Sequence, residues 1–380
     1  MKNVLLVMHS YPSNSSFLMN KFLRLEKHFK IKLLVWSKAS KVGNNVYTGL
    51  TDLSVVALLI TGLQALTTFV SKPKQSLLFC RKLGIKKFFK GHYFIRKYFD
   101  VIHFEFGTLA IEWMKLKTVC KSRIVVSFRG YDLNYFKLGN DETYSAVWQN
   151  ADAFHFLGRD LYNRALKRGY SSNKANFFIS PAIDLNLFKP NENKTYLSNG
   201  VLQLVSVGRL VWKKGIEYGL KAVQLLDQKG IPVHYTIIGD GENKQAIEFC
   251  IRELDLTHCI TMTYHLNQPK TVEILKSMDL FLHPAISEGF CNAVVEAQAM
   301  KLPVVCTTAD GLQENIEEGK TGFAVDIYDA LKLANQIEYF FNNKIKLSEF
   351  GECGRKRAEE HYKIEDQIDK FVKLYNEVSE

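Results

Sequence analysis

The 380-residue sequence has no C-x-x-C pair, no fixed-period repeat and no low-complexity tract. Without closely spaced cysteine pairs it offers neither a zinc-ribbon framework nor a dithiol redox centre. Its seven cysteines are odd in number and mostly lie in apolar runs, which predicts reduced, buried thiols in a cytosolic compartment. With 47% hydrophobic and 23% charged residues, the chain has the composition of a folded soluble protein.

The amino terminus has little of what a secretory leader requires. Its apolar run covers only Val4–Met8, and no small-residue cleavage site follows it. We interpret this run as a first buried strand that ends in a turn at Pro12.

Acidic residues are scarce in the first half of the chain. Residues 1–190 hold 29 Lys and Arg against 11 Asp and Glu, a net charge of +18, whereas residues 191–380 hold 21 against 28, a net charge of −7. The basic excess peaks in residues 71–100, where nine Lys and Arg accompany one Asp and are interleaved with Phe and Tyr. Such a segment suits an anionic membrane surface or a nucleic acid, and a solvated basic face is the simplest alternative. We expect the membrane surface and no nucleic acid.

Charge is absent from residues 53–71, LSVVALLITGLQALTTFVS, directly before the basic segment. The length alone would admit a membrane-spanning helix. Because polar residues such as Thr61 and Gln64 recur in it, and both flanks are typical of a cytosolic domain, we expect a buried or interfacial helix instead. Residues 53–100 together are predicted to attach the first domain to the inner face of the membrane.

Short apolar, β-branched runs alternate with longer helical stretches, a pattern that predicts parallel sheets covered by helices on both faces. A polar, turn-forming segment near residues 190–200 separates two such sets. The expected strands are Asn3–Met8, Ile31–Trp36, Val101–Glu105, Arg123–Phe128 and Ala153–Leu157, then Leu202–Val207, Val233–Ile238, Cys259–Met262, Leu280–His283 and Pro303–Cys306. The fold class is therefore α/β, with two doubly wound domains.

Ligands of open α/β sheets bind beyond the carboxyl ends of the strands, so the strand-to-helix loops are the places to search. In VSVGRLVWKKG, residues 205–215, a strand ends at Gly208, and Arg209 and Lys214 stand on either side of the turn into the next helix. An arginine fork, an ammonium and the amides at a helix start can converge on a phosphate. Ordinary surface charge beside a loop is the alternative.

A second loop, YTIIGDGENKQ, places Gly241 after a strand. Its G-x-G is an incomplete dinucleotide fingerprint because Lys244 stands at the third glycine position. The acidic residues Asp240 and Glu242 resemble a D-x-E metal site, but a tight turn is the simpler interpretation.

The third loop, SEGFCNAVVEAQA, carries two carboxylates with seven residues between them. Glu288 lies in the loop, near the amides at the start of the next helix, which favour an anion. Glu296 lies on that helix amid apolar residues, so it is an unusual surface residue. Carboxylates accept hydrogen bonds from vicinal hydroxyls, which suits both to a sugar.

With GRLVWKKG before it and PVVCTTADGLQENIEEGKTGF after it, EGFCNAVVE resembles the motif of the family 4 retaining glycosyltransferases. The resemblance implies the GT-B fold, in which two Rossmann-like domains face each other across a cleft. It implies an acceptor-binding domain, residues 1–190, to which a helix over 363–380 returns, and a nucleotide-sugar domain, residues 191–362. The first half matches only loosely, in DVIHFEFG, VVSFRGYDL and ISPAIDLNLF.

The resemblance also assigns roles by position. Arg209 and Lys214 would neutralise the leaving diphosphate, Glu296 would bind the ribose hydroxyls, and Glu288 would face the transferred sugar. The other implied donor contacts are Gly208, Gly241, Gly289, Phe290, Cys291, Asn292 and Glu314, and the acceptor side would hold Glu105, Gly107 and Asp132.

Three positions depart from the family pattern. Asp310 stands where the first glycine of a G-G-x-x-E segment is usual, and Glu105 and Arg129 stand where histidines are usual. A buried guanidinium needs an anionic partner. For Arg129 we consider Asp132, a phosphate, or a carboxylate on an acidic sugar, and we include Arg129 among the catalytic candidates with Glu288, Arg209 and Lys214.

The sequence thus predicts a metal-independent, retaining hexosyltransferase at the cytoplasmic membrane face. It would use a UDP- or GDP-linked sugar as co-substrate, with no other cofactor, and a glycan or lipid-linked acceptor in cell-surface polysaccharide biosynthesis. A catalytically impaired nucleotide-sugar or carbohydrate-binding protein, or a sugar epimerase of the same fold, are the alternatives.

Overall fold

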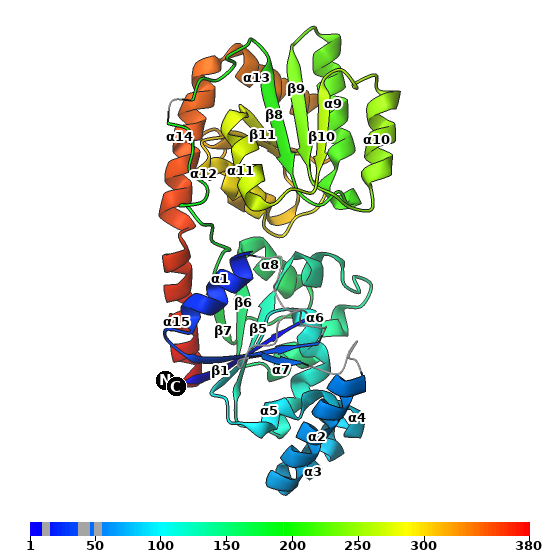
Figure 1. Ribbon diagram of the computed structural model, residues 1–380, viewed down its shortest axis with the longest axis vertical. Coiled ribbons are helices and arrows are strands. Elements are labelled where there is room, and N and C mark those ends of the chain that lie inside the picture. The colour runs from blue at the N-terminus through cyan, green and yellow to red at the C-terminus, as the bar shows by residue number, and fades with distance from the viewer. Residues whose placement is uncertain (10–15, 37–45, 49–54, 193) are drawn as a thin grey trace. The chain divides into compact units, whose positions relative to one another are not determined.

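The computed structural model describes residues 1–9, 16–36, 46–48, 55–192 and 194–380, and the expected turn at Pro12 lies outside them. The chain divides into two compact units, Met1–Ile179 with Gln367–Glu380, and Ser180–Asp366 (Figure 1). The first unit ends at Ile179 and the second begins at Ser180. This boundary lies earlier in the chain than residue 190, where the sequence pattern placed it.

The first unit is built on a parallel sheet of seven strands in the order β3-β2-β1-β4-β5-β6-β7. The strands are β1 Asn3–Met8, β2 Lys30–Val35, β3 Val46–Thr48, β4 Val101–Phe104, β5 Arg123–Phe128, β6 Ala153–Phe156 and β7 Ala175–Phe178. Its central strands are buried apart from the first residues of β1 and β5, and they are rich in Val, Ile, Leu and Phe, because helices cover both faces.

Helices of the first unit connect these strands. They are α1 Ser16–Leu25, α2 Val55–Ser71, α3 Pro73–Leu83, α4 Ile85–Gly91, α5 Tyr93–Arg96, α6 Gly107–Ala110, α7 Ser145–Asn150 and α8 Arg159–Lys167. The carboxyl-terminal helix α15, Ile364–Ser379, returns to this unit, as the sequence resemblance implied. The Tyr375 hydroxyl lies 2.7 Å from Nδ1 of His103 on β4, and both side chains are fully buried.

The second unit has a parallel sheet of six strands in the order β10-β9-β8-β11-β12-β13. The strands are β8 Leu202–Val207, β9 Val233–Ile238, β10 Ile260–Tyr264, β11 Leu280–His283, β12 Val304–Thr307 and β13 Gly322–Val325. The helices are α9 Ile216–Gln228, α10 Lys244–Glu253, α11 Gln268–Ser277, α12 Asn292–Ala299, α13 Ala330–Asn342 and α14 Lys344–His361. In both sheets the order reverses beside the first strand, which makes the doubly wound arrangement expected from the sequence.

Every strand expected from the sequence is present, with ends shifted by at most two residues. Three further strands, β3, β7 and β13, are each at most four residues long and lie at or next to a sheet edge. Short edge strands carry too few residues to show a clear pattern, and their pairing partners decide their conformation.

Over its described side chains, the helix α2 buries polar residues and exposes several large apolar ones, unlike an ordinary surface helix. Thr61 and Thr68 are buried, and the Gln64 side chain accepts a hydrogen bond from the Tyr93 hydroxyl. Among the described side chains of this helix, four large apolar ones point outward: Leu59 is 68% exposed, Leu63 64%, Leu66 58% and Val70 80%. Within the described residues, no helix is both long and apolar enough to span a bilayer.

Candidate active site

The loop after β8 carries the first candidate cations. Arg209 directly follows Gly208 and is exposed, and Lys214 ends a short 3₁₀ turn, Trp212–Lys214. Gly215 then adopts a left-handed conformation, φ 59°, and a Cβ there would lie 2.2 Å from the carbonyl oxygen of Pro284. Only glycine therefore allows this loop to pack directly on the loop that follows β11.

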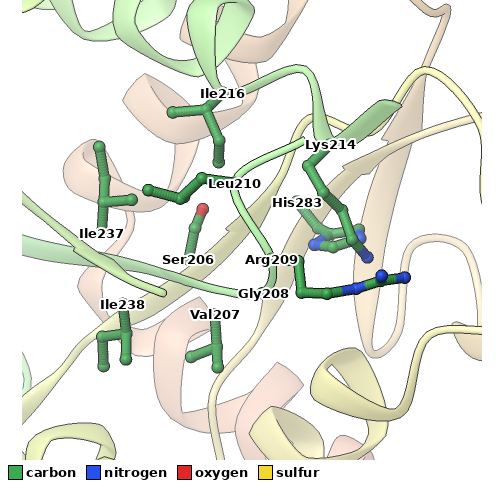
Figure 2. Close-up of a pocket in the computed structure, with 10 residues that line it drawn as sticks. All are labelled: Ser206, Val207, Gly208, Arg209, Leu210, Lys214, Ile216, Ile237, Ile238 and His283. Carbon is green, nitrogen blue, oxygen red and sulfur yellow. The ribbon is translucent and has the colours of Figure 1, made fainter. Parts of the chain in front are cut away.

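The side chains of Arg209, Lys214 and His283 lie on one side of the β8 loop and line a pocket whose other lining residues are largely apolar (Figure 2). His283 is the last residue of β11, so its side chain lies at the carboxyl edge of the sheet. This is where ligands of doubly wound sheets bind.

Lys214 forms an ion pair with Glu288, which joins the β8 loop to the β11 loop. Nε2 of His283 lies 3.7 Å from the same Glu288 carboxylate and 3.2 Å from Sγ of Cys291. His283 and Cys291 are 2% and 3% exposed, and the side chains of Glu288 and Lys214 are 12% and 14% exposed. Four ionisable groups thus share one nearly closed space.

Their charges stabilise one another. Burial opposes ionisation of Glu288, but Lys214 and His283 lower its pKa to about 2, so it is a carboxylate at neutral pH. Burial likewise disfavours the ammonium of Lys214, yet Cys291 and Glu288 outweigh it and raise its pKa. His283 and Lys214 lower the pKa of the Cys291 thiol against the effect of burial, and Cys291 in turn raises the pKa of His283. Loss of any one charge would leave its neighbours incompletely compensated.

Asp310 fixes the Glu288 loop. Its carboxylate accepts hydrogen bonds from the hydroxyl of Ser287 and from the backbone amide of Glu288, at 3.1 Å in the second case. Asp310 itself has φ 48°, the left-handed region that favours glycine and tolerates Asp. The departure from the family's glycine at this position therefore keeps the required backbone conformation and adds an anchor for Glu288.

Asn315 is a second anchor that the sequence analysis missed. This fully buried side chain accepts from the amide of Cys291 at 3.2 Å and donates to the carbonyl of the same residue at 3.4 Å. It holds the backbone that leads from Gly289 and Phe290 into Asn292, the first residue of α12. The only sequence signal was its place one residue after Glu314, in the segment that follows β12.

Glu296 and Glu314 lie on different elements near this loop. Glu296 is on α12, and burial raises the pKa of its carboxyl to about 7. Glu314 lies in a 3₁₀ helix, Asp310–Asn315, and its carbonyl accepts a hydrogen bond from Arg357 at 2.8 Å. Both side chains are half-buried.

Gly241 packs against the β8 loop, because a Cβ there would lie 2.3 Å from the carbonyl oxygen of Leu210. This contact by itself accounts for the glycine, in agreement with the tight-turn interpretation. Asp240 and Glu242 are exposed, and Asp240 accepts a hydrogen bond from the Gly241 amide at 2.9 Å. Across the described part of the chain, the group of His, Cys, Asp and Glu side chains close enough to share an ion is His283, Glu288 and Cys291, without this acidic pair.

In the first unit, the two residues that replace the family's histidines pair with each other. Nη2 of Arg129 donates to the Glu105 carboxylate at 2.8 Å, and Nε donates to the Glu105 carbonyl at 3.0 Å. Lys21 binds the other Glu105 oxygen at 2.5 Å. These two cations and His103 hold the pKa of the fully buried Glu105 well below its usual range, although burial opposes this.

Asp132 is therefore not the side-chain partner of Arg129. Its fully buried carboxylate accepts instead from two backbone amides, those of Thr108 and Arg129, each at 2.9 Å. Thr108 follows Gly107, the first residue of α6, so Asp132 ties the loop after β5 to the start of that helix. The expected loop-shaping role of Asp132 is present, but it acts through the backbone.

A chain of polar side chains runs across the sheet behind this cluster. Ser127 lies 2.7 Å from Nε2 of His103 and 2.7 Å from Nδ1 of His155, and His155 contacts the carbonyl of Ile179 at 2.8 Å. Its other end reaches Tyr375 of α15. Local sequence patterns gave no sign of this network, because its members are far apart in the chain.

Comparison with known proteins adds the family context. Residues 189–357 match the family model described as "Glycosyl transferases group 1", so the chain carries a group 1 glycosyltransferase domain. Over 215 residues it is 28% identical to the capsular polysaccharide biosynthesis glycosyltransferase CapM of Staphylococcus aureus, and over 246 residues 27% identical to the amylovoran biosynthesis glycosyltransferase AmsK of Erwinia amylovora. These matches cover 56% and 62% of the chain and 56% and 59% of the relatives, so the chain spans under two thirds of their length.

Solved structures resemble nearly the whole chain. Anabaena HepE in complex with UDP superimposes with a TM-score of 0.76 at 14% identity, covering 99% of this chain and 100% of that one. Sucrose-phosphate synthase from Thermosynechococcus elongatus gives 0.77 at 16% identity, covering 100% and 99%. The GT-B fold expected from the sequence is confirmed.

Proposed function

We propose that this protein transfers a sugar from a nucleoside-diphosphate donor to an acceptor hydroxyl. The observation that carries the proposal is the joined pair of loops after β8 and β11, in which Lys214, Glu288 and His283 meet beside the exposed Arg209. The group 1 glycosyltransferase domain and the HepE complex with UDP support it.

The chemical difficulty is the departure of a diphosphate from the anomeric carbon. Preformed positive charge at the departing oxygen stabilises the transition state more than the ground state. We assign this task to Arg209 and Lys214, which line the same pocket. Glu288 would accept hydrogen bonds from the transferred sugar, Glu296 from the ribose, and the loop backbone from Gly289 to Asn292 would complete the donor contacts.

We infer that transfer occurs with retention and without a metal ion. Arg209 and Lys214 supply the positive charge that a divalent ion would otherwise provide, and the exposed Asp240 and Glu242 do not join the group that could share an ion. Activity in excess chelator is the expected result, and a complete loss reversed by added Mg²⁺ or Mn²⁺ would contradict this part of the proposal.

We place the donor in the second unit and the acceptor in the first. The acceptor would be a glycan or a lipid-linked glycan of a cell-surface polysaccharide, as the names of CapM and AmsK suggest for those proteins. The experiment is to incubate the protein with a panel of UDP- and GDP-linked hexoses, with and without lipid-linked acceptors, and to measure released nucleoside diphosphate. We expect release above background for one donor and stimulation by acceptor.

The two alternatives differ in that measurement. A carbohydrate-binding protein with an impaired site would bind nucleotide without releasing diphosphate from any donor. An epimerase of the same fold would interconvert donors in the absence of an acceptor. The intact pairing of Lys214 and Glu288 favours transfer over both.

We further propose that α2 to α4 attach the first unit to an anionic membrane from the cytoplasmic side. The outward apolar face of α2, defined as Leu59, Leu63, Leu66 and Val70, recurs at helical spacing, so these side chains lie on one face. Exposed apolar residues continue on α3 and α4 with Leu77 and Ile85. Figure 1 shows these three helices as a group beside the sheet.

The charges of the same segment agree with this surface. Residues 55–99 contain no acidic residue, and nine Lys and Arg lie between residues 71 and 100. Each basic residue near an anionic surface contributes about 1 kcal/mol, and apolar side chains that enter the interface add to this. An apolar face beside basic helices suits an anionic membrane better than it suits nucleic acid, whose surface offers little to the leucines.

A further inference from the structure

We propose that His283, Glu288 and Cys291 form a binding site for a thiophilic divalent cation such as Zn²⁺, and that this cation occupies the donor site in place of the nucleotide sugar. These three residues offer an imidazole nitrogen, a carboxylate oxygen and a thiolate sulfur, the ligand types that zinc takes in proteins. Their ligand atoms all lie within 4.8 Å of one another.

The distances fit a tetrahedral centre. Zinc holds its ligands at about 2.0–2.3 Å, which places neighbouring ligand atoms roughly 3.3–3.8 Å apart. Nε2 of His283 lies 3.2 Å from Sγ of Cys291 and 3.7 Å from Oε2 of Glu288. Two edges of one face of such a tetrahedron are therefore already close to the required length, and the third, between Sγ of Cys291 and the Glu288 carboxylate, is within 4.8 Å.

The surroundings also suit a metal. His283 is held at the end of β11, Cys291 is fixed through Asn315, and Glu288 is anchored by Asp310, so the ligands come from a rigid frame. The thiol and the imidazole lie in contact and share a proton. Metal binding would release this proton to solvent. The fourth position would be taken by water or by an anion.

Lys214 makes this site inhibitory rather than catalytic. Its ammonium pairs with the Glu288 carboxylate, which is one of the three ligands, so a cation bound there must displace it. The long lysine side chain can turn away, but Lys214 and Glu288 are then both lost to the donor. The metal and the nucleotide sugar would therefore compete, which rests on the donor location proposed above.

The binding site itself is tested without any activity measurement. Titration of the purified chain with Co²⁺ should produce the intense absorption of a thiolate-to-cobalt transition together with the visible bands of a tetrahedral ion, and Zn²⁺ should displace them at one equivalent. Cys291→Ser should remove the thiolate band and weaken zinc binding by more than the roughly 10–100-fold that loss of an outer-shell partner costs. Cys353→Ser, which removes an exposed thiol, should leave both unchanged.

Three results would overturn the site, and the first two come from the cysteine variants. One is a cobalt complex of Cys291→Ser with the same spectrum and affinity as the unsubstituted chain. The other is loss of the signal in Cys353→Ser, which would show that the metal binds an exposed cysteine adventitiously. Absence of any thiolate band with the unsubstituted chain would equally reject the proposal.

A second measurement separates this inference from the proposed function. UDP or GDP added to the cobalt-loaded chain should bleach the thiolate band if metal and nucleotide exclude each other. If the band depends on Cys291 but no nucleotide affects it, the metal site stands and the donor location is wrong. If nucleotide binds equally well with and without bound Zn²⁺, the inhibitory role is wrong.

Discussion

At the scale of single residues, the candidate donor site is governed by charges that compensate one another before any ligand arrives. Lys214 and Glu288 are separated by 74 positions in the chain, yet they form one ion pair. The diphosphate of a nucleotide sugar would give Lys214 a second anionic partner. A hydroxyl of the sugar would donate a hydrogen bond to Glu288. The site can therefore exchange one set of partners for another without leaving a buried charge alone.

The side chain of Arg209 is exposed, so its replacement should change turnover without disturbing the fold. If it stabilises the departing diphosphate, Arg209→Ala should lower turnover by roughly 10²–10³, the range for removing one preorganised donor. Arg252→Ala, at an exposed position on α10, is the matched control and should keep full turnover. A folded Arg209→Ala protein with near-normal turnover would remove Arg209 from the mechanism.

Glu296 should make donor binding and stability respond to pH in opposite directions. Burial raises its pKa from 4.5 to about 7, so ionisation costs the folded state free energy that develops from about pH 4.5 and is complete above pH 7. Glu296→Gln removes this cost and should raise the free energy of unfolding at pH 8 by on the order of 1–3 kcal/mol, with no gain at pH 4.

The same substitution should weaken donor binding, because an ionised carboxylate accepts from both ribose hydroxyls and an amide accepts with one oxygen. The dissociation constant of the nucleotide should rise more at pH 8 than at pH 6, where the native carboxyl is mostly protonated. Denaturant titration and nucleotide binding at the two pH values measure both effects, with Glu253→Gln on α10 as the control. A purely surface role would move neither quantity.

Arg129 has an internal partner, Glu105, so it does not require a ligand to balance its charge. With Lys21 also on Glu105, the cluster still carries one net positive charge, which can favour an acidic sugar or a phosphate. Arg129→His should then lower turnover with a uronic acid donor or acidic acceptor more than with the neutral counterpart. Equal losses on both, compared by initial rates, would show that Arg129 acts only through the loop that it holds.

At the scale of elements, each site loop is fixed by a side chain from a neighbouring element. Asp310 and Asn315, both after β12, hold the backbone between Ser287 and Cys291. The position of the first residues of α12 is thus held by a segment that comes later in the chain. The E-x7-E stretch and the segment after β12 therefore form one structural unit.

The outward apolar face of α2 gives a prediction at the same scale. The protein should bind vesicles containing anionic lipid, and binding should weaken at high salt, because the Debye length shortens from about 10 Å at 0.1 M to 3 Å at 1 M. Leu63→Asp with Leu66→Asp should reduce binding at every salt concentration, since both side chains point outward and their replacement leaves the fold intact. Ile345→Asp, at an exposed apolar position on α14, is the control. Equal binding to neutral vesicles at all salt concentrations would contradict the electrostatic contribution.

At the scale of the whole molecule, the stability of the two units should respond differently to a fall in pH. Two fully buried histidines on β4 and β6 of the first unit are held neutral: burial lowers the pKa of His155 to about 3 and that of His103 well below its usual range. Burial also acts on His283 of the second unit, but the Cys291 charge raises its pKa. The groups that face His103 and His155 are Glu105, Lys21, Arg129 and Tyr375.

The first unit should therefore lose stability first as the pH falls. The unfolded chain takes up protons on both histidines below about pH 6.5 and the folded unit does not, so each costs about 1.4 kcal/mol per pH unit from there downward. Because Tyr375 joins α15 to His103, hydrogen exchange should show α15 and β4 losing protection between pH 6.5 and 4.5, with α9 unchanged. Loss of protection in α9 before α15 would contradict this account.

The sequence by itself determined the parallel α/β class, ten of the thirteen strands, the returning helix and the loops that carry Arg209, Lys214 and Glu288. These follow from local signals, namely apolar runs, turn residues and motif spacing, which act over a few residues. Tertiary structure alone decided that Lys214 pairs with Glu288 and that Glu105 rather than Asp132 neutralises Arg129. It also decided that Leu59, Leu63 and Leu66 of α2 point outward. Such partners are brought together by strand order and packing across tens of residues, and a pattern read along the chain contains no distance between them.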